Sequence, residues 1–190
     1  MADKRIFIAI DISDEARQRA ADHIAQLRRD ARDVRIGWEK SEKLHLTIKF
    51  LGSVTEKQLD GVDSAVATMA HRHKSFSASL GGSGVFPNPR QPRVLWLGIA
   101  SGLDQIGQLA EDIEATCQSL GFKPESRFYS PHLTIARIRE PKKGRDIATL
   151  HLLEGFSPVT FEVDYLTVYE SRLGQHGSTY SVISRHPLAT

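Results

Sequence analysis

The chain has 190 residues, and 40% of them are hydrophobic, which is enough to bury a core as one domain or as two small lobes. Lys and Arg number 25 against 23 for Asp and Glu, so any attraction to nucleic acid must come from a local patch. A single cysteine excludes an intramolecular disulfide and a multi-cysteine zinc site, and it favours a reducing compartment. The apolar run before Asp11 is too short for a signal peptide or a membrane span, so we expect a cytoplasmic protein.

The first half of the chain predicts alternating strands and helices. The apolar run RIFIAI (5–10) predicts a strand, and Ser13 is the expected N-cap of an amphipathic helix. A strand reading LHLTIKFLG follows, and then TEKQ from Thr55 has the pattern of a capping box that opens a second helix. The next strand alternates through SFSASLGGSGVF. We expect residues 81–93, GGSGVFPNPRQPR, to form the only long irregular stretch, as a surface loop beside the site.

The second half repeats this order. RVLWLGI predicts a strand, and a helix follows whose apolar stripe includes Cys117 and which ends at Gly121. A second HLTI strand, a shorter helix near RDIATLHLLEG and one alternating strand, VTFEVDYLTVYE, come next. The segment around His176 predicts a hairpin turn, and TYSVIS a last strand that pairs back into a sheet.

The spacing of the two halves indicates an internal duplication. Arg93 follows Arg5 by 88 positions, and His132 follows His45 by 87. We therefore expect a single bilobal domain over 1–190, with repeat units at roughly 5–80 and 93–170. Its predicted class is α+β, with two antiparallel-rich sheets, helices on their outer faces, and a central cleft between lobes related by a pseudo-twofold axis.

Each HLTI strand places a histidine and a threonine on one face. His45 and Thr47 share a face, as do His132 and Thr134, because side chains alternate along a strand. The pattern His-apolar-Thr-apolar is expected by chance only about 0.07 times in this chain. Descent alone could preserve the apolar residues, but a buried polar pair without partners costs free energy, so the repeat indicates function.

Two histidines across a cleft suit acid–base chemistry on a phosphodiester. Imidazole titrates near pH 6.5, so one ring can take a proton from water while the other protonates the leaving oxygen. The threonine hydroxyls can donate to phosphate oxygens. This chemistry needs no metal or other cofactor, and a bell-shaped pH profile is expected.

The two motifs, LHLTIKFLG and SPHLTIARIR, resemble those of the 2H phosphoesterase superfamily, in particular its RNA 2',3'-cyclic phosphodiesterases, also called 2'-5' RNA ligase-like proteins. RIFIAIDIS, GVFPNPRQPRVLWLGI and YESRLGQHGSTYSVI are also similar to that family, so the resemblance covers nearly the whole chain. It implies that His45 protonates the departing ribose 3'-oxygen, that His132 accepts the proton of water, and that the product ends in a 2'-phosphate. It also implies RNA or small nucleotides with 2',3'-cyclic phosphate ends as substrates, and in vitro joining of RNA ends through a 2'-5' bond; no membrane or obligate protein partner is indicated.

Other candidates have two interpretations. Arg137 matches an arginine that the family often carries and could bind phosphate, but simple alternation places it opposite His132, so this role requires a bulge near Ala136. Lys49, on the face of His45 by alternation, could neutralise phosphate or lie at the rim. A further set mixes charge with rings and could contact single-stranded RNA or simply pack: Phe86, Arg90, Arg93, Arg127, Phe128 and Tyr129.

A second function class stays open at this point. A nucleotide-binding module could keep both histidines without turning over a substrate. Intact histidine and threonine in both motifs favour the enzyme, and turnover of a 2',3'-cyclic nucleotide in EDTA would separate the two.

Overall fold

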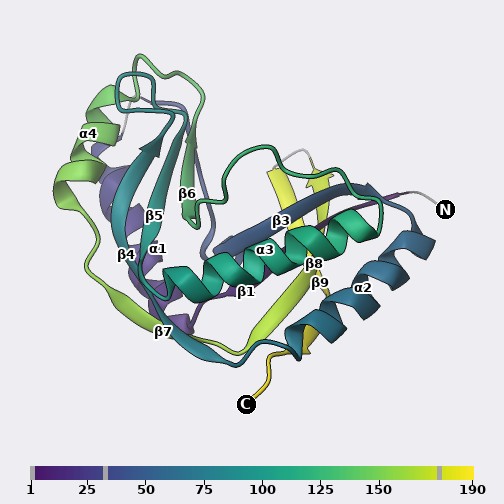
Figure 1. Cartoon of the computed structure of the whole chain (residues 1–190). Helices are drawn as coiled ribbons and strands as arrows, with labels where there is room; N and C mark the ends of the chain where they lie inside the picture. Colours follow the sequence, from purple (N-terminus) through teal and green to yellow (C-terminus); the bar gives the residue numbers. More distant parts are fainter. Residues whose placement is uncertain (1–2, 32–33, 175–176) are drawn as a thin grey trace.

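Two antiparallel sheets and four helices make up the residues described by the computed structural model, 3–31, 34–174 and 177–190 (Figure 1). Sheet A has the strand order β3-β1-β8-β9, and sheet B the order β2-β6-β5-β4-β7. None of the helices in these residues is long and apolar enough to cross a membrane. In chain order the elements are β1 (Lys4–Asp11), α1 (Asp14–Asp30), β2 (Ile36–Trp38), η1 (Ser41–Lys43), β3 (His45–Val54), α2 (Glu56–Ala70), β4 (Phe76–Phe86), β5 (Val94–Ser101), α3 (Leu103–Ser119), β6 (Leu133–Ile138), α4 (Arg145–Glu154), β7 (Val159–Val163), β8 (Tyr165–Gly174) and β9 (Gly177–Pro187).

The predicted α+β class and the predicted helix starts are confirmed. The Ser13 hydroxyl accepts from the Ala16 backbone N–H at 3.2 Å, and Thr55 and Gln58 form a reciprocal capping box at the start of α2. Cys117 is buried in α3 as expected, and burial raises the pKa of its thiol to about 11. The predicted turn at His176 lies outside the described residues, while β9 pairs with β8 on either side of it.

The two sequence halves exchange elements between the sheets. After β1, helix α1 crosses over to pack against β7 and α4, and after β5, helix α3 crosses to pack against β3 and α2. In Figure 1, α2 and α3 cover sheet A, and α1 and α4 lie against sheet B. β4 of the first half belongs to sheet B, and β8 of the second half belongs to sheet A. Each lobe is therefore built from both halves of the chain.

A buried histidine pair fastens α1 to the second half. His23 Nε2 and His151 Nδ1 are 3.0 Å apart, and His151 Nε2 lies 3.0 Å from the Trp96 carbonyl oxygen. A carbonyl only accepts, so His151 Nε2 carries a proton, and in the neutral ring Nδ1 accepts from His23. Burial favours that neutral form and lowers the pKa of His151 to about 4.

Two expectations about strands are wrong. VTFEVDYLTVYE is not one strand: β7 ends at Val163 as an edge of sheet B, and β8 begins at Tyr165 in sheet A. The buried positions change phase across Asp164, from Val163 to Leu166, which marks the break.

The predicted loop at 81–93 is shorter than expected. Gly81–Phe86 belongs to β4, and Gly84 lies under the Trp96 ring so closely that a Cβ would come within 2.0 Å of it. The glycine therefore permits close packing within a strand and does not mark a loop. A longer irregular segment spans residues 120–132, between α3 and β6.

Both HLTI strands carry a bulge at the same place, three residues after the histidine. In β3, Thr47 pairs with Ala9 and Lys49 with Ile8, so Ile48 is the extra residue. In β6, Thr134 pairs with Trp96 and Ala136 with Leu95, so Ile135 is extra. A bulge reverses the alternation beyond it, so the residue five positions after each histidine returns to the histidine's face.

The bulge moves Lys49 to the opposite face, so the prediction that it shares the face of His45 is wrong. Lys49 is 7% exposed, and its Nζ lies 2.5 Å from Glu114 Oε2 of α3. A buried lysine needs such a partner because an unpaired charge in the core is strongly unfavourable.

Lys49 is therefore predicted to act on stability and not on catalysis. Lys49→Ala should lower the free energy of unfolding by about 2 kcal/mol, because the buried lysine stem and its charge-assisted hydrogen bond to Glu114 are lost, while kcat/KM of the folded fraction stays unchanged. Urea denaturation and initial rates measure the two effects. The neutral double variant Lys49→Met/Glu114→Gln is the control and should recover much of the loss; a kcat/KM defect in a fully folded Lys49→Ala protein would contradict this placement.

Candidate active site

His45 lies at the start of β3 against a floor of aromatic rings. Its ring stacks on Phe7 of β1 with centroids 4.8 Å apart and on Tyr169 of β8 at 5.6 Å, and Tyr180 of β9 meets it edge-on at 5.3 Å. Phe7 contacts the other three rings and is itself 1% exposed. These contacts fix the plane of the imidazole.

Arg17 of α1 holds the backbone on either side of this floor. Its Nη1 donates to the carbonyls of Ser41 and Leu44 at 2.9 and 3.0 Å, and its Nη2 donates to that of Ile12 at 3.3 Å. These carbonyls belong to the entry into β3 and the exit from β1. One guanidinium therefore fixes the backbone at the start of β3, where His45 lies.

Burial dominates the protonation of His45. It lowers the pKa of the imidazole to about 4, because the charged form loses its hydration. Asp11, its cross-strand neighbour, and a hydrogen bond to the Lys43 backbone act in the other direction, and the Arg17 charge lowers the pKa slightly further. In the free protein at neutral pH, His45 is therefore an uncharged imidazole.

His132 immediately precedes β6 and also lies against aromatic rings. Phe86 of β4 meets it edge-on at 5.0 Å, and the Trp96 ring lies 6.2 Å away. Its Nδ1 is 2.7 Å from the Ser130 carbonyl oxygen, so Nδ1 carries the proton in the neutral ring. Nε2 then has a lone pair, the state that a general base requires.

The two motif strands approach each other through the segment that precedes β6. The Tyr129 hydroxyl donates to the Thr47 carbonyl at 3.0 Å, and burial raises the pKa of that phenol. β3 and β6 are in contact, and both threonines are half-buried. We call this region, defined by His45, Thr47, His132 and Thr134, the two-histidine site.

Arg137 meets the structural condition for a phosphate contact. The bulge at Ile135 returns it to the face of Thr134, and its side chain is 62% exposed, with Nε 3.7 Å from Glu39 Oε1. The pKa of Tyr180 is raised mainly by burial and then by Glu39, and Arg137 opposes this, so Arg137 lies near the ring that contacts His45. The bulge at Ile48 has the same effect in β3. It brings Phe50, which is 69% exposed, to the corresponding place after His45.

The remaining predicted contacts fall into two groups. Phe86 and Tyr129 pack inside the site, as the contacts above show. Phe128, Arg90, Arg93 and Arg127 are exposed, and Phe128 is fully so.

Sequence reasoning missed the aromatic floor and Asp11, although alternation contains the signal. Phe7 and Asp11 stand at even spacing in β1, and they pair with Phe50 and His45. Asp11 accepts hydrogen bonds from Thr167 and Tyr169, and Arg185 lies 3.5 Å from it. Which β1 residues lie beside His45 depends on the register between β1 and β3, and alternation within one strand does not determine that register.

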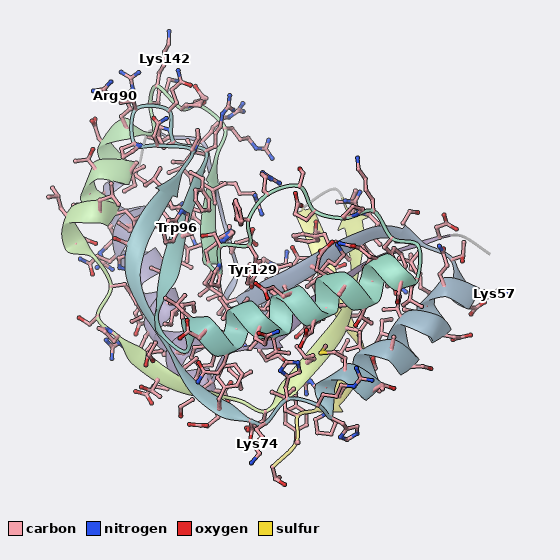
Figure 2. The ribbon with its side chains drawn as sticks, viewed as in Figure 1. Lys57, Lys74, Arg90, Trp96, Tyr129 and Lys142 are labelled. Atoms are coloured by element: carbon pink, nitrogen blue, oxygen red, sulfur yellow. The ribbon has the colours of Figure 1, made fainter. Side chains whose placement is uncertain are left out.

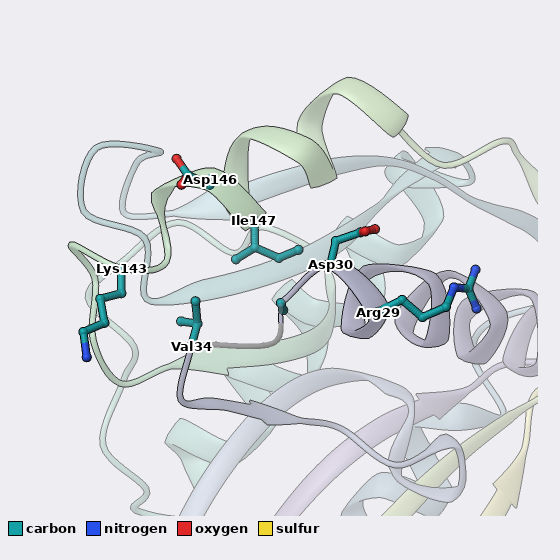
Figure 3. Close-up of a pocket in the computed structure, with 7 residues that line it drawn as sticks. Arg29, Asp30, Val34, Lys143, Asp146 and Ile147 are labelled. Carbon is teal, nitrogen blue, oxygen red and sulfur yellow. The ribbon is translucent and has the colours of Figure 1, made fainter.

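A separate pocket of about 590 Å³ lies away from the two-histidine site. Figure 3 shows Ile147 at the start of α4 pointing toward Asp30 at the end of α1, while the side chains of Arg29 and Asp146 extend away from each other. Its lining includes no residue of either HLTI motif. His45 and His132 therefore lie outside this pocket.

A family model now connects this geometry to known proteins. The model of LigT-like phosphoesterases matches residues 10–96 and 97–180, one match for each half of the chain. The chain belongs to the LigT-like phosphoesterases. The expected membership of the 2H phosphoesterase superfamily is confirmed. The prediction that the protein is a phosphoesterase is confirmed as well.

Similar proteins cover nearly all of the chain. A protein of Methanothermobacter thermautotrophicus, named RNA 2',3'-cyclic phosphodiesterase, is 31% identical over 93% of this chain and 95% of its own. A protein of the same name from Thermotoga maritima is 32% identical, and the match covers 94% of this chain and 92% of the relative. A crystal structure from Thermus thermophilus superposes with a TM-score of 0.79 at 25% identity and covers 97% of each chain. The structure of E. coli LigT in apo form shares the fold, with a TM-score of 0.74 at 24% identity over the whole of both chains.

The burial of His45 leads to a prediction for the free and anion-bound protein. Its imidazole should titrate at about 4 without ligand, and inorganic phosphate should raise that pKa, because a nearby anion stabilises the imidazolium. Histidine ring NMR over pH 3 to 8 measures both, with His45→Gln assigning the resonance. Titration between pH 6 and 7 in the free protein would show that the ring is not enclosed as described, and no shift with phosphate would show that the anion does not bind beside His45.

Proposed function

We propose that this phosphoesterase hydrolyses 2',3'-cyclic phosphate ends of RNA to 2'-phosphomonoesters through His45 and His132, without a metal ion. The observation that carries the proposal is the duplicated histidine–threonine pair on two strands that contact each other, with each histidine against aromatic rings. The name shared by the archaeal and bacterial relatives supports the RNA substrate. A cytoplasmic location belongs to the same proposal.

The proposed reaction is an in-line displacement at phosphorus. His132 Nε2 takes a proton from water as the water oxygen attacks, and the bond from phosphorus to the ribose 3'-oxygen breaks. His45 gives its proton to that 3'-oxygen, which leaves as a hydroxyl, while the phosphate remains on the 2'-oxygen. Thr47 and Thr134 donate to the non-bridging oxygens, whose charge grows in the transition state.

The lowered pKa of His45 bears on this assignment. A neutral imidazole at pH 7 is not an acid, so the donor role requires His45 to gain its proton when substrate binds. A phosphodiester is an anion, and it acts in the same direction as Asp11, raising the pKa of His45. His132, with its proton on Nδ1, is already arranged as the base. The same steps with an RNA 5'-hydroxyl in the place of water would form a 2'-5' bond as the 3'-oxygen leaves, and so would join RNA ends.

Loss of either histidine is predicted to slow turnover strongly. With 2',3'-cyclic AMP in EDTA, the wild type should produce 2'-AMP, and His45→Ala and His132→Ala should each lower kcat by about 10² to 10⁴, because each removes one proton transfer. Initial rates and 31P NMR of the product measure this, with His73→Ala as a control outside the site.

Three outcomes would count against parts of the proposal. No turnover by the wild type would leave a nucleotide-binding module as the better interpretation. A 3'-phosphate product would mean that the 2'-oxygen leaves, and the donor and acceptor roles would then need exchange. Turnover lost in EDTA and restored by a divalent ion would exclude the metal-free mechanism.

Arg137 is proposed to hold the phosphate as a charged donor. Arg137→Gln should lower kcat/KM for 2',3'-cyclic AMP about 10- to 100-fold, because a charge-assisted hydrogen bond is lost in a partly enclosed site, and Arg137→Lys should recover only part of it. Steady-state kinetics measure this. Glu39→Gln, which removes only the ion-pair partner of Arg137, is the matched control, and an equal loss in that variant would show that Arg137 acts through Glu39.

A further inference from the structure

Eight basic side chains gather at one end of sheet B, beyond the two-histidine site. They come from the start of β2, the β4–β5 loop, and the segment from the end of β6 into α4. Figure 2 shows two of them, Arg90 and Lys142, close together at this end of the molecule. All are exposed, and we call them the basic tip: Arg35, Arg90, Arg93, Arg137, Arg139, Lys142, Lys143 and Arg145.

Backbone contacts hold the three segments of the basic tip together. The Ile138 N–H donates to the Arg93 carbonyl at 2.8 Å, and the Arg139 N–H donates to that of Arg35 at 3.3 Å. Arg145 Nε donates to the Arg90 carbonyl at 2.8 Å, which joins the loop before β5 to the start of α4. The basic side chains therefore project from a fixed framework, so binding an anion does not require ordering these segments.

Much of this charge is not neutralised within the chain. Glu39 pairs with Arg137, and Glu140 pairs with Lys143 at 2.7 Å. Arg90, Arg139 and Lys142 have no carboxylate partner among the residues that the structure describes. The whole chain has a formal charge of only +2, so this concentration is local.

β6 connects the basic tip directly to the two-histidine site. The strand starts beside His132 and ends at Ile138, and its bulge places Thr134 and Arg137 on one face. Because Ile135 is an extra residue, four regular steps of about 3.3 Å separate Arg137 from His132, or about 13 Å, so Arg137 lies between the histidines and the rest of the tip. A polymer that starts at the histidines can therefore follow β6 to the tip.

We propose that the basic tip binds the phosphates of the RNA strand on the 5' side of the cyclic phosphate. This rests on the proposed function. A 2',3'-cyclic phosphate is always the 3' end of its strand, so every other nucleotide of the substrate lies on the 5' side. DNA lacks the 2'-hydroxyl and cannot form such an end. The enzyme therefore acts on RNA ends in preference to mononucleotides, and contacts with the tip account for the higher kcat/KM on RNA.

The test compares two substrates in two triple variants. Arg90→Gln/Arg139→Gln/Lys142→Gln removes three tip charges, and the control Lys57→Gln/Arg72→Gln/Lys74→Gln removes three charges outside the tip. Figure 2 shows Lys57 and Lys74 far from Arg90 and Lys142. The substrates are 2',3'-cyclic AMP and a ten-nucleotide RNA with a 2',3'-cyclic phosphate end. The tip variant should lose at least 10-fold in kcat/KM on the RNA and less than twofold on the mononucleotide, and the control should change neither.

Salt dependence gives a second measure. Single-stranded nucleic acid releases about 0.7 counterions per neutralised phosphate, so losing three contacts should make the slope of log kcat/KM against log salt shallower by about 2 on the RNA. The slope on 2',3'-cyclic AMP should not change between wild type and tip variant.

Equal losses on both substrates, no loss on the RNA, or the same loss in the control variant would each overturn the proposal. If the wild type turns over neither substrate, only the proposed function is contradicted. Fluorescence anisotropy with the same RNA carrying a 3'-hydroxyl then measures whether the tip binds RNA. Vesicles with 30% phosphatidylserine are the last probe. If the tip variant loses binding to the vesicles but binds RNA like the wild type, the surface is a membrane contact and the proposal is overturned.

Discussion

The site depends on how the two HLTI strands pair with β1 and β5. Pairing fixes which side chains share a face, and the extra residue at Ile48 and at Ile135 reverses the alternation in the same place in both strands. Without the bulge, Arg137 would point away from His132, and Lys49 would share the face of His45 instead of pairing with Glu114. The duplication therefore preserves a local backbone irregularity as well as the letters of the motif.

The two histidines have similar surroundings but are buried to different degrees. Each lies against a ring from the strand beyond its partner strand, Tyr169 for His45 and Phe86 for His132, and each hydrogen-bonds backbone two residues earlier. His45 is more enclosed, over Phe7 and beside Tyr180, and burial lowers its pKa to about 4. A pseudo-symmetric frame therefore holds two imidazoles of one chain in unequally buried settings.

The exchange of helices and strands between the halves makes the site a property of the whole chain. α1 leaves β1 to pack on sheet B, where His23 meets His151, and its Arg17 still holds the entry to β3. A change in α1 can thus affect both sheets. The basic tip shows the same principle, because residues from both halves contribute its charges.

The sequence determined the elements, the α+β class, the duplication and the paired histidines and threonines, because hydrophobic periodicity, capping residues and a repeated motif are local signals. It also named Arg137 by resemblance and stated that a bulge was required. Only the tertiary structure decided the faces of Lys49 and Arg137, the break at Asp164, the strand character of Gly81–Phe86 and the aromatic floor under His45. Each of these depends on register with a strand far away in the chain, and a single extra residue in that register reverses every face beyond it.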